Sequence, residues 1–160
     1  MGDVDSVTFP PDLAGSVSFR VRLVQIAAYK SFEKVIAGLG SAPRYFGLLK
    51  LVEANPGITQ VRLAEAICLD RSSLVPILER LEREDWVERR ASNRDRRVRR
   101  VFLTDAGAEG LRGLEREVAR HESMMVAGLD GSEHGALIDM LDRIEANLRA
   151  ALAKDEGPGA

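Results

Sequence analysis

The stretch between residues 59 and 81 constrains the fold more than any other part of this sequence. Its small and apolar residues recur at the spacing of two short helices that cross at a steep angle; they are Leu63, Ala64, Ile67, Leu69, Leu74 and Ile77. Thr59 and Asp70 stand where the N-caps of the two helices belong. A glycine with positive φ is usual between such helices, but Cys68 occupies that place, so the turn either relaxes or holds strain. The stretch predicts a helix-turn-helix.

A hairpin rich in arginine follows the two helices. Residues 86–90 and 99–103 alternate apolar and charged side chains as short strands do, and the link between them has the composition of a hairpin loop. Seven arginines and one acid, Asp95, lie between Arg89 and Arg100, although the formal net charge of the chain is −2. A run of charges is often only solvated surface. Arginine, however, binds phosphate through two donors, and a polyanion would neutralise the repulsion among the clustered arginines. We therefore favour contact with nucleic acid, with Asp95 either orienting an arginine or serving as an ordinary turn residue.

Together these features predict a winged helix-turn-helix, in a chain that is mainly α with a small two-stranded β-wing. The second helix of the pair would enter the major groove, while the wing arginines reach the adjacent minor groove, whose negative potential attracts guanidinium groups. Pro76 lies about two turns into that helix and predicts a slight kink or a cap shifted toward Ser72. The candidate DNA-contacting residues are Gln60, Arg71, Ser72, Ser73, Pro76 and Arg80 in the helices and Arg94, Asp95, Arg96 and Arg97 in the wing.

Helical segments flank this unit on both sides. Residues 16–40 and 105–153 carry apolar residues that the small domain between them cannot cover. We expect them to be dimerisation helices in an intertwined homodimer; the alternative is that they fold back on the same chain as a four-helix layer. Thr104 and Ser132 are the predicted N-caps of the two later helices. The other predicted segments are a flexible N-terminal arm (1–15), a DNA-binding domain (41–104) and a loose tail (154–160).

Other function classes are excluded by what the sequence lacks. His121 and His134 stand alone, no string of glycines could cradle a phosphate, and the single Cys68 provides neither a disulfide framework nor a cysteine-rich zinc site. We therefore expect no enzyme activity, no metal and no cofactor. No apolar run approaches the roughly 18 residues of a membrane span, and the acidic N-terminus is unlike a signal peptide. A cytoplasmic protein without a membrane partner is expected.

Four stretches carry a resemblance to a known family. Residues 57–66, 70–74 and 81–90, and above all the Asp-x-Arg…Leu-Thr-x-x-Gly signature over residues 95–107, resemble the MarR family of bacterial transcription regulators. The likeness extends over about residues 16–152 and departs at Cys68 and Asp85, where glycine is common. It implies a homodimer whose first and last helices intertwine, with two winged helices on a pseudo-palindromic DNA operator. It also implies that Arg97 is the minor-groove arginine and Asp95 its partner in the wing.

The resemblance further implies a small-molecule effector held between the dimerisation helices and the winged helix, often an aromatic carboxylate or an acyl-CoA thioester. The expected function is a ligand-responsive repressor that such a molecule releases from its operator. The alternatives are a winged helix used for protein contacts and a redox sensor through Cys68. For Cys68 itself we expect packing in the protein interior rather than a redox role. Each aromatic candidate for the pocket could equally be ordinary core; the pocket candidates are Phe19, Arg20, Arg22, Tyr29, Phe32, Arg44, Tyr45, Phe46, His121 and Met125.

Overall fold

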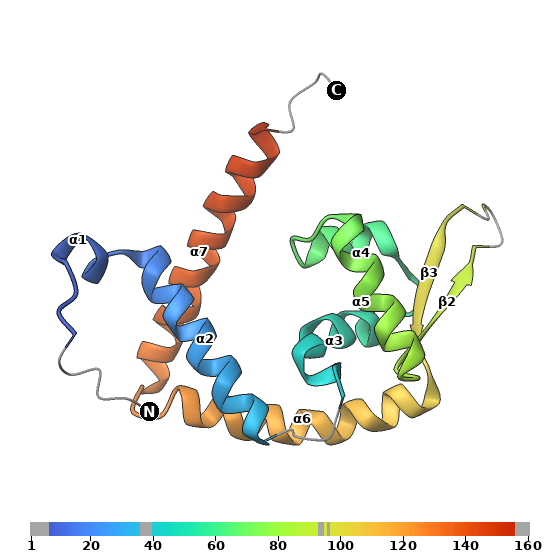
Figure 1. Cartoon of the computed structure of the whole chain (residues 1–160), viewed down its shortest axis with the longest axis horizontal. Helices are drawn as coiled ribbons and strands as arrows, with labels where there is room; N and C mark the ends of the chain where they lie inside the picture. The colour runs from blue at the N-terminus through green and yellow to red at the C-terminus, as the bar shows by residue number, and fades with distance from the viewer. Residues whose placement is uncertain (1–6, 36–39, 93–94, 96, 156–160) are drawn as a thin grey trace. The chain divides into compact units, whose positions relative to one another are not determined.

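The computed structural model describes residues 7–35, 40–92, 95 and 97–155. The chain forms two compact units, one ending at His121 and the other beginning at Glu122. Figure 1 traces the elements in chain order. They are α1 (Pro11–Ala14), α2 (Val17–Val35), the 3₁₀ turn η1 (Ala42–Tyr45), α3 (Phe46–Ala54), β1 (Ile58–Thr59), α4 (Gln60–Ala66), α5 (Arg71–Arg83), β2 (Val87–Ala91), β3 (Arg99–Leu103), α6 (Asp105–Met125) and α7 (Gly131–Asp155).

Side-chain caps start three of the helices where the sequence predicted them. Thr59, Asp70 and Thr104 each accept the backbone N–H of the residue three positions on, at 3.3, 2.8 and 2.8 Å. The prediction for α7 was wrong, because Asp130 and not Ser132 is the cap. The Asp130 carboxylate accepts the backbone N–H groups of Ser132 and Glu133 at 2.8 and 2.9 Å, so Ser132 already lies in the first turn.

The sheet has three antiparallel strands in the order β1-β3-β2, one more than the two-stranded wing predicted. Strands β2 and β3 pair from Val87↔Leu103 to Ala91↔Arg99 and form the wing hairpin. Strand β1 adds two residues on the other side of β3, with Ile58 opposite Val101. In Figure 1 the hairpin stands beside α4 and α5, and β3 leads directly into α6.

The hydrophobic core lies between α3, α4, α5, the sheet and the first half of α6. Its fully buried side chains are Leu49, Val52, Leu63, Leu74, Leu78, Leu81, Val87, Val101, Leu111 and Leu114. Gly107 of α6 lies so close to the start of the wing that a Cβ there would be 2.0 Å from the carbonyl oxygen of Trp86. The close approach packs the start of α6 directly against the backbone at the base of the wing.

The predicted N-terminal arm contains a one-turn helix, α1, with Pro11 at its first position. Arg20 of α2 donates from Nε to the carbonyl oxygen of Ala14 at 3.0 Å. The rings of Phe9 and Phe19 pack with their centroids 5.9 Å apart. These contacts tie the segment around α1 to the start of α2.

Both flanking helices expose large apolar side chains. On α2 they are Val17, Val21, Leu23, Val24 and Ile26, and on α7 they are Leu137, Ile138, Met140, Leu141, Leu148 and Leu152. Within the described residues no helix combines the length and the apolar character needed to cross a bilayer.

Candidate nucleic-acid interface

Helix α5 has one buried face and one exposed polar face. Leu74, Leu78 and Leu81 are buried in the core. The predicted DNA-contacting residues of this helix are all exposed: Arg71, Ser72, Ser73, Pro76 and Arg80. The helix runs through Pro76, and its cap is Asp70, so the cap is not shifted toward Ser72.

A hydrogen-bonded cluster organises the N-terminus of α5. The Ser72 hydroxyl donates to Asp70 Oδ1, and the Ser73 hydroxyl donates to Oδ2 at 2.9 Å. These hydrogen bonds lower the pKa of Asp70 to about 2. The Ser72 hydroxyl has the largest effect, followed by the backbone N–H and the hydroxyl of Ser73. Because each serine proton is used within the cluster, only the lone pairs of the hydroxyls remain available. Such acceptors suit the amino groups of cytosine and adenine in the major groove.

Two arginines of the basic run make contacts within the winged helix. Arg89 donates from Nε and Nη2 to Glu82 Oε2 at 3.0 and 2.6 Å, which fastens β2 to the recognition helix α5. The guanidinium of Arg90 lies 4.8 Å from the ring centroid of Phe102 on the neighbouring strand. These two arginines stabilise the wing, so the count of seven overstates the charge that is free to meet DNA.

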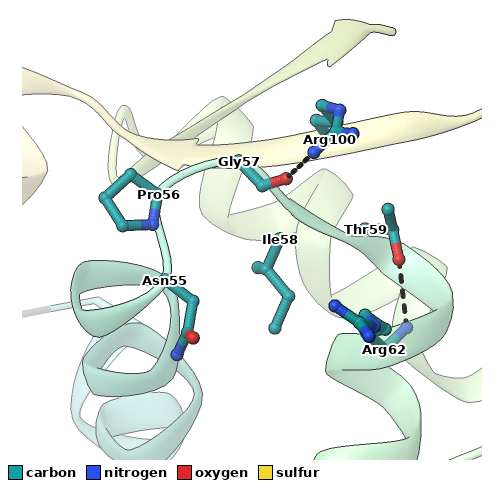
Figure 2. Close-up of a pocket in the computed structure, with 7 residues that line it drawn as sticks. All are labelled: Asn55, Pro56, Gly57, Ile58, Thr59, Arg62 and Arg100. Carbon is teal, nitrogen blue, oxygen red and sulfur yellow. Dashed lines mark hydrogen bonds between the residues drawn. The ribbon is translucent and has the colours of Figure 1, made fainter. Parts of the chain in front are cut away.

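Arg100 has a similar structural role at the foot of the wing. Its Nη1 donates to the carbonyl oxygen of Gly57 at 2.8 Å, as Figure 2 shows. Gly57 has a φ of 78°, and a Cβ there would be 2.9 Å from the Phe102 ring, so only glycine fits this turn. A cavity of about 550 Å³ opens here, lined by Asn55, Pro56, Gly57, Ile58, Thr59, Arg62 and Arg100.

Arg97 and Asp95 form the described part of the wing tip, and the predicted contacts Arg94 and Arg96 lie outside the described residues. The Asp95 carboxylate accepts the backbone N–H of Arg97 at 2.9 Å, and its carbonyl oxygen accepts that of Val98 at 3.0 Å. The Asp95 carboxylate thus fixes the backbone of Arg97 within the turn, and its orienting of an arginine side chain stays a prediction. The Arg97 side chain is exposed and makes no hydrogen bond or ion pair with any residue the structure describes.

Gln60 is placed differently from the other predicted DNA contacts. Its side chain is only 5% exposed, and its Nε2 has no hydrogen-bond partner among the described residues. A buried donor without an acceptor costs about 1–3 kcal/mol. Gln60 lines a second cavity together with Arg71, Arg97 and Arg99. Arg99 was not among the predicted contacts, although it lies two residues after Arg97, and in an extended chain residues two apart point to the same face.

Two positions where glycine is common hold other residues in the left-handed region. Cys68 has a φ of 53° and Asp85 a φ of 58°. The turn of the helix-turn-helix therefore keeps its geometry and holds strain. Cys68 is exposed, so the expectation of buried packing was wrong.

Some of the predicted effector-pocket residues contact one another. The ring centroids of Phe32 and His121 are 4.9 Å apart, and His121 Nε2 lies 2.7 Å from the Ser31 hydroxyl. The same hydroxyl lies 2.9 Å from the carbonyl oxygen of Ala28, so Ser31 links α2 to His121 of α6.

A second group surrounds Arg44. Its guanidinium lies 5.7 Å from the ring centroid of Tyr29 and 6.0 Å from that of Tyr45. Glu33 accepts a hydrogen bond from the Tyr29 hydroxyl, which raises the pKa of Tyr29. The group therefore offers an exposed cation between two aromatic faces.

The other pocket candidates lie apart from both groups in the described contacts. Phe19 and Arg20 contact the segment around α1, and Arg22 is exposed on α2. Phe46 packs against the hydrophobic core. Met125 is exposed and belongs to the second unit.

Known proteins are similar to this chain in both sequence and fold. The model of the MarR family matches residues 42–98. A putative transcriptional regulatory protein for the hcr operon of Thauera aromatica is 35% identical over 133 residues, which cover 82% of this chain and 80% of that protein.

Three solved structures of two transcriptional regulators, CouR and PcaV, are also similar. The repressor CouR bound to a 23-mer DNA duplex has a TM-score of 0.79 at 29% identity, covering 88% of this chain and 99% of that one. CouR bound to p-coumaroyl-CoA has a TM-score of 0.76 at 27% identity, covering 87% and 98%. PcaV from Streptomyces coelicolor in complex with its natural ligand has a TM-score of 0.78 at 27% identity, covering 87% and 98%. With its winged helix, its exposed recognition helix and these relatives, the chain belongs to the MarR family of DNA-binding transcriptional regulators.

Proposed function

We propose that this protein is a homodimeric repressor that a small aromatic acid or its CoA thioester releases from a pseudo-palindromic operator in the cytoplasm. The observation that carries the DNA-binding part is the free side chain of Arg97 on the wing beside the exposed polar face of α5. A reading helix and an arginine-tipped wing in one unit can engage a major groove and the adjacent minor groove together.

The exposed apolar faces of α2 and α7 support the homodimer. Large side chains such as Val24, Leu148 and Leu152 are about 60% exposed in the single chain, and apolar surface of this extent indicates a partner. Two copies related by a two-fold axis would place their recognition helices in successive major grooves about 10 bp apart. Light scattering measures the mass directly, and a monomer at micromolar concentration would contradict the proposal.

The group around Arg44 supports an aromatic carboxylate as effector. A carboxylate can bind the guanidinium through two hydrogen bonds while its ring packs against Tyr29 or Tyr45. CouR and PcaV were each solved with a bound ligand, p-coumaroyl-CoA in the case of CouR. The effector must bind more tightly to a dimer whose recognition helices are wrongly spaced, since equal affinity for both states shifts nothing.

A thermal-shift screen of benzoate, hydroxybenzoates, cinnamates and their CoA thioesters tests the effector class. A ligand selective for the native state raises the melting temperature, and it should also release the protein from DNA. Arg44→Gln should abolish the shift, whereas Arg22→Gln, another exposed arginine of the predicted pocket, serves as the matched comparison. A binder that stabilises both variants as it does the wild type would place the effector site elsewhere.

A further inference from the structure

A cavity of about 310 Å³ lies where the start of α4, the start of α5 and the tip-side end of β3 meet. Its lining contains three arginines and no carboxylate. The lining residues are Thr59, Gln60, Val61, Arg71, Arg97, Val98 and Arg99. A concave surface with this composition carries a positive potential that favours an anion.

The positive charge of the cavity is largely uncompensated. The side chains of Arg71 and Arg97 form no hydrogen bond or ion pair with the residues the structure describes. Arg99, the third arginine of the lining, interacts only weakly with Glu82. The hydrogen bonds from Arg89 are the main cause of the lowered pKa of Glu82, and the charge of Arg99 is the smallest of the causes. Two guanidinium groups therefore remain available to a ligand.

Gln60 adds an unused hydrogen-bond donor to the same cavity. The side chain is more than nine-tenths buried, and its Nε2 has no partner within the described part of the chain. A terminal amide can turn about its last torsion and present its N–H groups to an acceptor on the cavity side. A bound oxyanion would supply the acceptor that the protein does not.

The position of the cavity identifies the anion. A recognition helix in the major groove and a wing in the adjacent minor groove lie on opposite sides of one sugar-phosphate backbone. That backbone has to cross the protein between α5 and the wing, which is where Gln60, Arg71 and Arg97 meet. We propose that the cavity is a seat, that is, a binding site, for one phosphodiester group of this strand. Arg71 and Arg97 hold the phosphate, and the phosphate accepts a hydrogen bond from Gln60. The inference rests on the proposed DNA-binding function and assigns a residue of the protein interior to it.

The first test compares variants of the full-length protein on a duplex of roughly 24 bp, selected by the wild type from a random pool. Gln60→Met removes the amide at similar length and should weaken binding roughly tenfold, the loss of one hydrogen bond to a charged group. Its melting temperature without DNA should be unchanged or higher, because the unpaired buried donor is gone. A merely structural Gln60 would leave the affinity unchanged, and that result overturns the proposal.

Charge variants separate the seat from general electrostatics. Arg71→Gln should weaken binding and reduce the slope of log affinity against log salt by about one unit for each recognition unit of the dimer, about two in all. Arg112→Gln removes the same charge from an exposed position on α6, where the arginine pairs with Glu109, and should leave the slope unchanged. Gln60→Glu places a carboxylate in the seat and should weaken binding more than Gln60→Met does. Equal losses for Arg71→Gln and Arg112→Gln would overturn the proposal.

A test on the DNA avoids any question of folding. Each phosphate of the duplex is replaced in turn by a neutral methylphosphonate. We expect one linkage in each half-site, on the strand between the two contacted grooves, at which the wild type loses roughly tenfold in affinity and Arg71→Gln loses less, because Arg97 and Gln60 still contact that phosphate in the variant. No such linkage, or equal sensitivity of both proteins, would overturn the proposal while leaving DNA binding itself intact.

Inorganic phosphate distinguishes the two sources of the anion. Phosphate could stabilise the wild type against heat more than it stabilises Gln60→Glu at matched ionic strength, while no DNA linkage proves sensitive. These two results together would assign the cavity to a free phosphate compound and overturn the diester assignment. A wild type that binds no duplex at low salt would refute the proposed function as well.

Discussion

Replacing Gly107 with alanine should separate α6 from the base of the wing. The new Cβ would lie 2.0 Å from the carbonyl oxygen of Trp86 and 2.8 and 3.0 Å from two further backbone atoms, whereas ordinary contact begins at 3.4 Å. The helix would have to move by about 1.4 Å, because backbone atoms cannot rotate away. This displacement breaks the 3.2 Å hydrogen bond from Thr104 N–H to Trp86 and loosens the packing of Leu111 and Leu114.

The magnitude follows from these terms. Overpacking of a well-packed contact costs about 1–3 kcal/mol, and the lost hydrogen bond costs about 1 kcal/mol more. Alanine in a helix interior recovers about 1 kcal/mol relative to glycine. The net expectation for Gly107→Ala is a loss of about 1–3 kcal/mol in the free energy of unfolding.

Gly113 in the same helix provides the control, because a Cβ there meets no atom within 4 Å. Gly113→Ala should stabilise the protein by about 0.5–1 kcal/mol through helix propensity alone. Urea unfolding at one fixed protein concentration measures both variants, since the stability of a dimer depends on concentration. If the two alanine variants shift the midpoint in the same direction, the close packing of α6 on the wing is refuted.

Three further outcomes are expected. Arg97→Ala should weaken duplex binding at least tenfold by fluorescence anisotropy while light scattering shows an unchanged mass; unchanged affinity would remove the wing from the interface. Asp70 is held charged by its hydrogen bonds, so the stability it contributes is present above pH ~4 and lost as the pH falls toward its folded-state pKa of about 2. Thermal melts should therefore show a larger loss between these pH values for the wild type than for Asp70→Asn, and parallel curves would contradict this cause. Leu141→Lys on the exposed apolar face of α7 should dissociate the dimer, whereas a dimer that persists would place the interface elsewhere.

Features set by neighbouring residues could be predicted from the sequence. The caps at Thr59, Asp70 and Thr104 each depend on a side chain and a backbone N–H three residues away, and all three are confirmed. The cap of α7 was misplaced because Asp130 and Ser132 both have side chains that suit an N-cap. The Asp130 carboxylate accepts two backbone N–H groups at once, which decides between them.

Features set by distant partners could not be predicted in this way. The two residues of β1 are too short for a periodic pattern, and they become a strand only because β3 pairs with them. Arg89 and Arg90 look like wing-tip charges in the sequence, yet Glu82 and the Phe102 ring hold them within the structure. The burial of Gln60 likewise depends on how β3 packs against α4.

The salt dependence of duplex affinity tests the central claim most directly. Each neutralised phosphate contributes about −0.9 to the slope of log affinity against log salt. Two recognition units that each hold one phosphodiester group with Arg71 and Arg97 neutralise at least two phosphates, so a slope of about −1.8 or steeper is expected between about 50 and 300 mM salt. A slope near zero would show that these arginines meet no phosphate and that the winged helix serves protein contacts instead.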